Sequence, residues 1–137
     1  MYRKIMVPVD LVHRDQLDKA LKSAADLAKH YGATVTYVGV TPETPSPVAH
    51  NPREFAEKLS SFAKTEAEAH GHAVDSHAMT STDPAVDLDK TLLRAIEQTG
   101  ADLVVMASHK PNIADWFWAS HGGTVASEAD ISVFLVR

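Results

Sequence analysis

Four short apolar runs divide the chain. They occupy residues 5–9, 35–40, 103–106 and 133–136, and each is rich in β-branched or aromatic side chains. Several of them lack clean alternation, and strands that are apolar on both faces are typical of a parallel sheet covered by helices on each side. A fifth run, residues 73–79, alternates apolar and polar positions, which predicts an edge strand.

The segments between the first runs carry a helical period. Apolar side chains recur every three or four positions over residues 17–31, and Gly32 follows as a stop signal. A second helix is expected to begin at Asn51, a cap residue, with proline at the first helical position and Glu54 where a capping box places an acid. Its predicted apolar face runs through Phe55, Leu59 and Phe62.

The second half of the chain repeats these signals. Asp83 followed by proline predicts the start of a third helix, and Gly100 predicts its end. The positions predicted to face inward are Val86, Leu92, Leu93 and Ile96. A last short helix is expected over about residues 123–128. Residues 41–50 contain three prolines and are predicted to form a surface loop rather than a helix or a central strand.

Strict alternation of strands and helices predicts a doubly wound α/β fold. The length of 137 residues suits a single domain spanning residues 1–137. We expect five parallel strands in the spatial order 3-2-1-4-5, with two helices on each face of the sheet. In such folds a ligand binds beyond the carboxyl ends of the strands, where the winding reverses. A ligand site is therefore expected at those ends.

Composition narrows the function classes. Thirteen basic and 18 acidic residues give a formal charge of −5, which argues against general affinity for nucleic-acid phosphates. The absence of cysteine excludes disulfides and zinc sites of the cysteine type. No run approaches the roughly 20 apolar residues of a membrane span, so no membrane insertion is expected. These features predict a cytoplasmic protein.

Four segments of the chain resemble the strands of one known protein family. Residues 5–10 read IMVPVD, residues 37–40 read YVGV, residues 101–109 read ADLVVMASH, and residues 133–137 read VFLVR. Each is similar to a strand of the universal stress protein family, and the segments follow one another in the family order over the whole chain. The resemblance implies the doubly wound fold described above. It also implies an adenine-nucleotide site, with ATP as the typical ligand.

The resemblance assigns the base and ribose end of that site to residues after the first two strands. It implies that the Asp10 carboxylate accepts hydrogen bonds from the ribose hydroxyls or contacts the adenine. It places Val40 against the base and Pro8 in the wall of the cleft. The alternative for Asp10 is a cap of the loop that follows, and Pro8 and Val40 are also ordinary residues for strand ends.

The phosphate end departs from the family pattern. Nucleotide-binding members carry G-x-x-G, nine further residues, and then G-S or G-T. Here Ala107 and Lys110 occupy the first two glycine positions, Ala119 the third, and no glycine lies between Gly100 and Gly122. Because a Cβ atom blocks close approach of backbone N–H groups to phosphate, this loop predicts weak nucleotide binding.

The same loop supplies the remaining candidate residues. Residues 108–121 read SHKPNIADWFWASH and resemble a sub-pattern of stress proteins that includes regulators associated with solute transporters. By this resemblance His109 lies near the phosphates, Ser120 donates to a phosphate at a helix N-terminus, and His121 takes the following position. Lys110 is a candidate to compensate electrostatically for a lost glycine contact. An N-cap role for Ser120 and plain surface exposure for Lys110 are the alternatives.

Three hypotheses for function follow. The first is a regulatory stress-response protein with a degenerate adenine-nucleotide cleft. The second is a dimeric scaffold, or a regulator of a partner such as a solute transporter, that binds no nucleotide. The third is a slow ATPase, which the missing Walker A lysine loop disfavours. No nucleophile and base are grouped as catalysis requires, so we expect no enzyme activity. His70, His72 and His77 form a pattern that can bind metal, but it falls on a turn and an alternating strand, and no metal is predicted.

The last strand predicts an assembly. It carries apolar side chains on both faces and must lie at an edge of the sheet, where an uncovered apolar strand invites aggregation. The resemblance implies an isologous homodimer in which this strand pairs with its twin. The residues that would form the contact are Ile131, Val133, Phe134, Leu135 and Val136.

Overall fold

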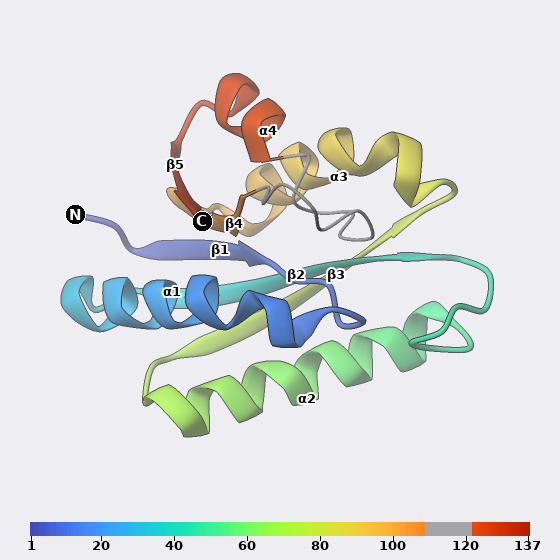
Figure 1. Ribbon diagram of the computed structural model, residues 1–137, viewed down its shortest axis with the longest axis horizontal. Helices are drawn as coiled ribbons and strands as arrows, with labels where there is room; N and C mark the ends of the chain where they lie inside the picture. Colours follow the sequence, from blue (N-terminus) through green and yellow to red (C-terminus); the bar gives the residue numbers. More distant parts are fainter. Residues whose placement is uncertain (109–121) are drawn as a thin grey trace.

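The computed structural model describes residues 1–108 and 122–137, which form one parallel sheet with helices on both faces (Figure 1). The strands are β1 (Lys4–Pro8), β2 (Thr34–Pro42), β3 (Val74–Ser81), β4 (Leu103–Ala107) and β5 (Ser132–Val136). All four neighbouring pairs are parallel, and the order across the sheet is β3-β2-β1-β4-β5. The predicted fold class and strand order are confirmed.

The helices lie between the strands along the chain. They are a 3-10 turn η1 (Arg14–Leu17), α1 (Asp18–Tyr31), α2 (Pro52–His70), α3 (Pro84–Thr99) and α4 (Gly122–Glu128). Figure 1 shows α1 and α2 on one face of the sheet and α3 and α4 on the other. This arrangement follows from right-handed crossovers, because the chain winds outward from β1 to β3 and then returns to β4 on the opposite face.

The residues predicted to end the first helix and begin the second, Gly32 and Asn51, take those positions in the structure. Gly32 follows α1 in the left-handed conformation with φ of 66°, and its N–H donates to the carbonyl of Ala28. At the start of α2 the Asn51 side-chain oxygen accepts the N–H of Glu54 at 2.8 Å. The Glu54 carboxylate reaches one residue further back than in the standard capping box and accepts the N–H of His50 at 3.3 Å.

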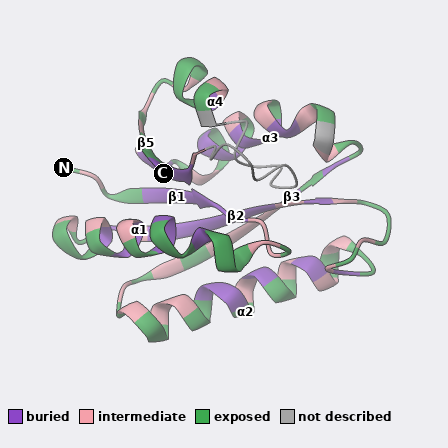
Figure 2. Cartoon of the chain, in the orientation of Figure 1, coloured by how far each residue is buried: buried purple, intermediate pink, exposed green. Residues whose placement is uncertain are grey.

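The hydrophobic core lies on both faces of the central strands. Residues 5–9 and 103–107 are all buried, as Figure 2 shows for β1. The residues of β3 and β5 are mostly half-buried or exposed, which is the pattern of edge strands. No helix in the described part of the chain is long and apolar enough to cross a membrane.

Two local predictions are wrong. Val86 lies in the first turn of α3 and is 75% exposed, so it does not face inward. The buried position is taken by Leu88, one helical turn before Leu92. The loop does not begin at residue 41, because β2 continues to Pro42, which pairs with Ser81 of β3. A proline fits here because it occupies the last position of the strand, where the ladder ends.

Candidate functional site

The candidate site lies where the sheet changes its direction of winding. β1 is flanked by β2 and β4, whose connections leave on opposite faces of the sheet. Beyond the end of β1 the N–H of Val9 still donates to the carbonyl of Val38 at 2.8 Å. Asp10 is therefore the first residue to leave the sheet, at the position where doubly wound folds bind ligands.

A cavity of about 130 Å³ opens beside Asp10. Asp10 and Val40 both line it, so the structure brings together two residues that are separated in sequence by the whole of α1 and most of β2. The other lining residues are Val9, Leu11, Val12, Thr41, Pro42, Ser46, Pro47, Val48 and Phe55. The walls are mainly apolar, with the Asp10 carboxylate as the charged group, which is the composition expected of a site for an aromatic base attached to a polar group.

The Asp10 carboxylate is held by its own loop. Its Oδ1 accepts the N–H of Val12 at 3.0 Å, and its Oδ2 lies 2.8 Å from Nδ1 of His13. The Asp10 side chain is 14% exposed and that of His13 is 28% exposed. Each carboxylate oxygen has a second lone pair, so the group can still accept hydrogen bonds from a ligand. This remaining capacity fits the ribose hydroxyls that the sequence resemblance assigns to Asp10.

The other predicted site residues are placed differently. Pro8 is buried in β1 and Ala107, 9% exposed, is the last residue of β4; neither lines the cavity. The remaining candidates, His109, Lys110, Ser120 and His121, fall within residues 109–121 and lie outside the described residues.

Ser108 is a site residue that the sequence did not single out. It follows the last residue of β4, and its N–H donates to the carbonyl of Val136 at 2.7 Å. Its hydroxyl is buried and has no hydrogen-bond partner within residues 1–108 and 122–137. A buried polar group normally has a partner, so this hydroxyl is a candidate donor to a ligand at the carboxyl edge of the sheet.

The loop after β2 forms the outer wall of the cavity. The N–H of Ser46 donates to the carbonyl of Ala49 at 2.8 Å, and the Ser46 hydroxyl oxygen accepts the N–H groups of Val48 and Ala49, each at 3.3 Å. These bonds close a turn that places Val48 both in the cavity wall and at the adjoining groove. The prolines on either side limit the backbone further, so this wall is built before any ligand arrives.

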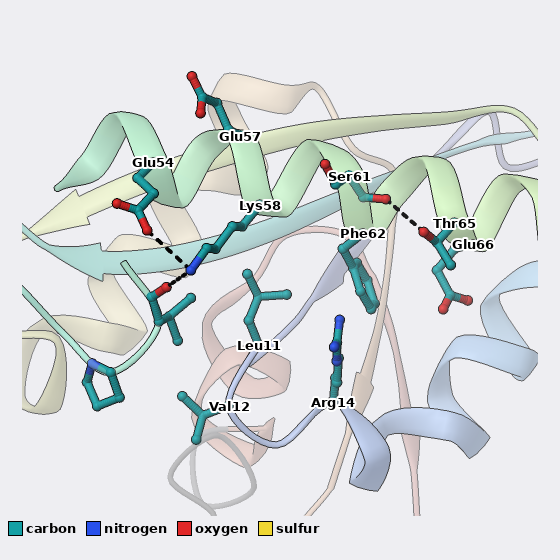
Figure 3. A pocket seen from close by; sticks show the side chains of 12 residues that line it. Leu11, Val12, Arg14, Glu54, Glu57, Lys58, Ser61, Phe62, Thr65 and Glu66 are labelled. Carbon is teal, nitrogen blue, oxygen red and sulfur yellow. Dashed lines mark hydrogen bonds and ion pairs between the residues drawn. The ribbon is translucent and has the colours of Figure 1, made fainter. Parts of the chain in front are cut away.

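A larger groove of about 1000 Å³ adjoins the cavity and shares Leu11, Val12, Pro47 and Val48 with it (Figure 3). It runs between α2 and the loop before α1, but it contains neither Asp10 nor Val40. Figure 3 shows Leu11 and Val12 on the loop side, with Arg14 reaching toward Phe62 of α2. Because Asp10 and Val40 line the small cavity, the groove is an extension of the site rather than its centre.

Charged side chains line the α2 side of the groove. Nζ of Lys58 lies 3.3 Å from Oε1 of Glu54 and also donates to the carbonyl of Val48. Nδ1 of His50 lies 3.0 Å from Oε2 of Glu54. The hydrogen bonds from His50, followed by that from Lys58, hold the pKa of Glu54 below its ordinary value. The start of α2 is thus tied to the wall of the cavity.

The three histidines of the pattern that can bind metal have separate partners. Nε2 of His72 lies 3.1 Å from the hydroxyl of Tyr37, Nε2 of His70 lies 3.3 Å from Oε2 of Glu66, and Nε2 of His77 lies 2.8 Å from Oε1 of Gln98. The three rings therefore have three separate partners. In the described ranges no group of three or more histidine or acidic side chains is placed to hold a metal ion.

Sequence reasoning missed two further residues of the site, His13 and Phe55. The Asp-x-x-His spacing from Asp10 was the available signal for His13, because a single turn brings positions three apart together. Phe55 was recognised only as part of the apolar face of α2, and its place in the cavity wall depends on how closely α2 approaches β2.

The family model of the universal stress protein family matches residues 1–137, so the chain belongs to that family. Universal stress protein G of Shigella flexneri is 27% identical over 145 residues, and universal stress protein G of Salmonella typhimurium is 28% identical over 143 residues. In both comparisons the match covers the whole of each chain.

Solved structures of the family share the fold. A universal stress protein from Archaeoglobus fulgidus superposes with a TM-score of 0.74 at 18% identity, covering the whole of both chains. A universal stress protein in complex with cAMP gives 0.72 at 17% identity, covering 99% of this chain and 97% of the other. The Archaeoglobus fulgidus protein in complex with dAMP gives 0.69 at 19% identity, covering 99% and 98%. At these identities the likeness shows the fold.

Proposed function

We propose that this chain is a regulatory universal stress protein that binds the adenosine part of an adenine nucleotide at the carboxyl end of β1. In this proposal the Asp10 carboxylate accepts hydrogen bonds from the ribose hydroxyls, and Val40 packs against the base. The observation that carries the proposal is the shared cavity, in which a half-buried carboxylate with free lone pairs faces apolar walls at the point where the winding reverses.

The complexes of relatives support the choice of ligand. Two proteins with the same fold were solved with cAMP and with dAMP. Both ligands carry adenine on a sugar phosphate, and an apolar wall beside a hydrogen-bond acceptor suits adenine and its sugar. The cavity of about 130 Å³ is smaller than the roughly 300–1,000 Å³ of a pocket that encloses a drug-sized ligand, so it suits one part of a nucleotide.

The phosphate end is the weaker part of the proposed site. Ala107 stands where the family pattern has its first glycine, so its Cβ atom keeps phosphate oxygens away from the backbone. Each lost hydrogen bond to a charged phosphate costs about 1.5–3 kcal/mol. Losing two of them lowers affinity roughly a hundredfold or more. We therefore expect weak binding with little preference for ATP over AMP.

Calorimetry with ATP, ADP and AMP tests this proposal, together with native and denaturing mass spectrometry of the purified protein for a bound nucleotide. The expected result is weak binding of all three, which Asp10→Ala abolishes without unfolding the protein. Tight ATP binding with strong discrimination against AMP would show that the phosphate end has been rebuilt. Unchanged binding by Asp10→Ala would place the ligand elsewhere.

A second candidate function is a dimeric scaffold that binds no nucleotide, including a regulator of a protein partner. The observation that favours it is the edge strand β5, where Phe134 is 47% and Leu135 is 40% exposed. Apolar side chains on an unpaired edge favour pairing with a second copy. The two candidates are separated by the titration: a dimer that binds none of the three nucleotides supports the scaffold alone.

A further inference from the structure

His13 stands beside the one carboxylate on which the proposed adenosine site depends. Its Nδ1 lies 2.8 Å from Oδ2 of Asp10, and both side chains are largely shielded from solvent. The N–H of Val12 occupies Oδ1, so the two oxygens have different partners and the carboxylate plane is fixed. The N–H of His13 also donates to the carbonyl of Asp10 at 3.1 Å, which closes the turn that brings the ring back.

The chemistry of the pair sets the direction of this hydrogen bond. An ionised carboxylate can only accept, so Nδ1 of His13 must carry the hydrogen. Hydrogen bonds to a carboxylate are stronger than those between neutral groups, so this bond and that from the N–H of Val12 together fix the direction in which the remaining lone pairs of Asp10 point.

We propose that His13 is a positioning residue that holds the Asp10 carboxylate in the orientation in which it accepts hydrogen bonds from the ribose hydroxyls. The inference rests on the proposed function of the cavity. When the ring is removed, Oδ2 loses its partner and the carboxylate can rotate, so ligand binding must also restore its orientation, which lowers the affinity. Loss of the donor at residue 13 should therefore weaken adenosine binding.

Other charged groups surround this loop among the described residues. Within the loop and the turn that follows it, Arg14 and Asp15 come directly after His13, and both are exposed. From the first turn of α1 the nearest acid is Asp18. The α2 residues that line the adjoining groove are Glu54, Glu57, Lys58 and Glu66. Among these charged groups, Asp10 is the one that contacts the His13 ring. Substitutions at His13 therefore change the contact with Asp10 and leave the other charges in place.

The test compares three proteins with adenosine, which carries no phosphate and so reports on the base and ribose end of the site alone. Binding is followed by two-dimensional NMR titration at pH 8 for the wild type, His13→Ala and His13→Asn. Asparagine places its amide nitrogen where Nδ1 of the ring lies, so it keeps the donor.

The two variants should separate loss of the hydrogen-bond donor from loss of the ring. His13→Ala should bind adenosine about tenfold more weakly than the wild type at pH 8, and His13→Asn should bind it about as well as the wild type. The matched ligand is 2′,3′-dideoxyadenosine, which lacks the hydroxyls that Asp10 accepts. The alanine variant and the wild type should bind this ligand equally.

The outcomes are distinct. If the wild type binds no adenosine, the proposed function fails and the role of His13 fails with it. If the wild type binds but His13→Ala binds equally well, Asp10 needs no positioning and only this inference is overturned. If His13→Asn binds adenosine as weakly as His13→Ala, the donor at this position does not set the affinity and the inference is overturned. An equal loss with both ligands assigns His13 to the stability of the loop.

Discussion

Phe55 of α2 packs its ring edge against the bare α-carbon of Gly39 in β2. A Cβ atom at residue 39 would lie 2.7 Å from Cζ and 2.9 Å from Cε1 of that ring. Phe55 is 4% exposed and also forms part of the cavity that contains Asp10. The close approach of α2 to β2 at this point thus helps to set the width of the candidate site.

We expect Gly39→Ala to lower the free energy of unfolding by about 1–3 kcal/mol, as overpacking of a tight core does. The displaced ring should also weaken adenosine binding. Urea unfolding and NMR titration measure the two effects. The double variant Gly39→Ala with Phe55→Leu should recover part of the stability. The matched control is Gly123→Ala, since nothing lies within 4 Å of a Cβ atom there. Equal stability of both alanine variants would contradict the packing argument.

Asp102 joins the starts of the two central strands. Its carboxylate accepts the N–H of Arg3 at 2.9 Å and the N–H of Lys4 at 3.1 Å. We expect Asp102→Ala to lower the free energy of unfolding by about 1.5–3 kcal/mol, because two backbone donors lose a charged acceptor. Asp102→Asn keeps one acceptor oxygen and should cost less.

Urea unfolding with Asp130→Ala as the control checks this expectation. Asp130 is an exposed acid before β5, and its removal should change stability by no more than about 0.5 kcal/mol. If the alanine variants at 102 and 130 are equally stable, the carboxylate of Asp102 adds nothing to the strand pairing.

Two titratable groups near Tyr37, His72 and Glu66, should change the free energy of unfolding with pH in opposite directions. Burial, followed by the positive charges of His70 and Lys29, lowers the pKa of His72 below 6.5. The unfolded chain then binds more protons just below pH 6.5, so stability is lost as the pH falls through that window. Burial raises the pKa of Glu66 above 4.5. The folded chain then binds more protons above pH 4.5, so stability is lost as the pH rises through that window.

Chemical unfolding between pH 4.5 and 8 tests the pH dependence of stability that each group contributes. Glu66→Gln removes the acid, so the variant should gain stability relative to the wild type as the pH rises above 4.5. His72→Gln removes the titrating ring and leaves a group that can still bond to the Tyr37 hydroxyl. It should gain relative to the wild type as the pH falls below 6.5. A stability difference that does not change with pH would refute the assignment for the residue concerned.

The edge strand β5 gives a prediction about assembly. If two copies pair through β5, Phe134→Lys should produce monomers at tens of micromolar, because lysine on the edge opposes pairing. Light scattering of the wild type should then give twice the monomer mass. Val86→Lys is the matched control, since Val86 is another exposed apolar residue, on α3. A monomeric wild type, or a dimer unaffected by Phe134→Lys, would rule out this interface.

Much of the fold was predictable because each element carries a local signal. The buried strands are apolar on both faces, and the helix ends at Gly32 and Asn51 depend on the conformations and hydrogen bonds of neighbouring residues. The parallel sheet with helices on both faces followed from the strict alternation of strands and helices. Asp10 could be singled out because it comes directly after a central strand.

The remaining features depended on contacts between distant segments. A helical period fixes which positions are apolar, but Val86 shows that an apolar residue in a first turn need not reach the core. The pairing of Pro42 with Ser81 required the register of two strands. Phe55 became part of the site only through the approach of α2 to Gly39, whereas His13 reaches Asp10 through a local turn whose spacing is visible in the sequence. Sequence alone determined the elements because burial is periodic, whereas tertiary packing decided which side chains share one cavity.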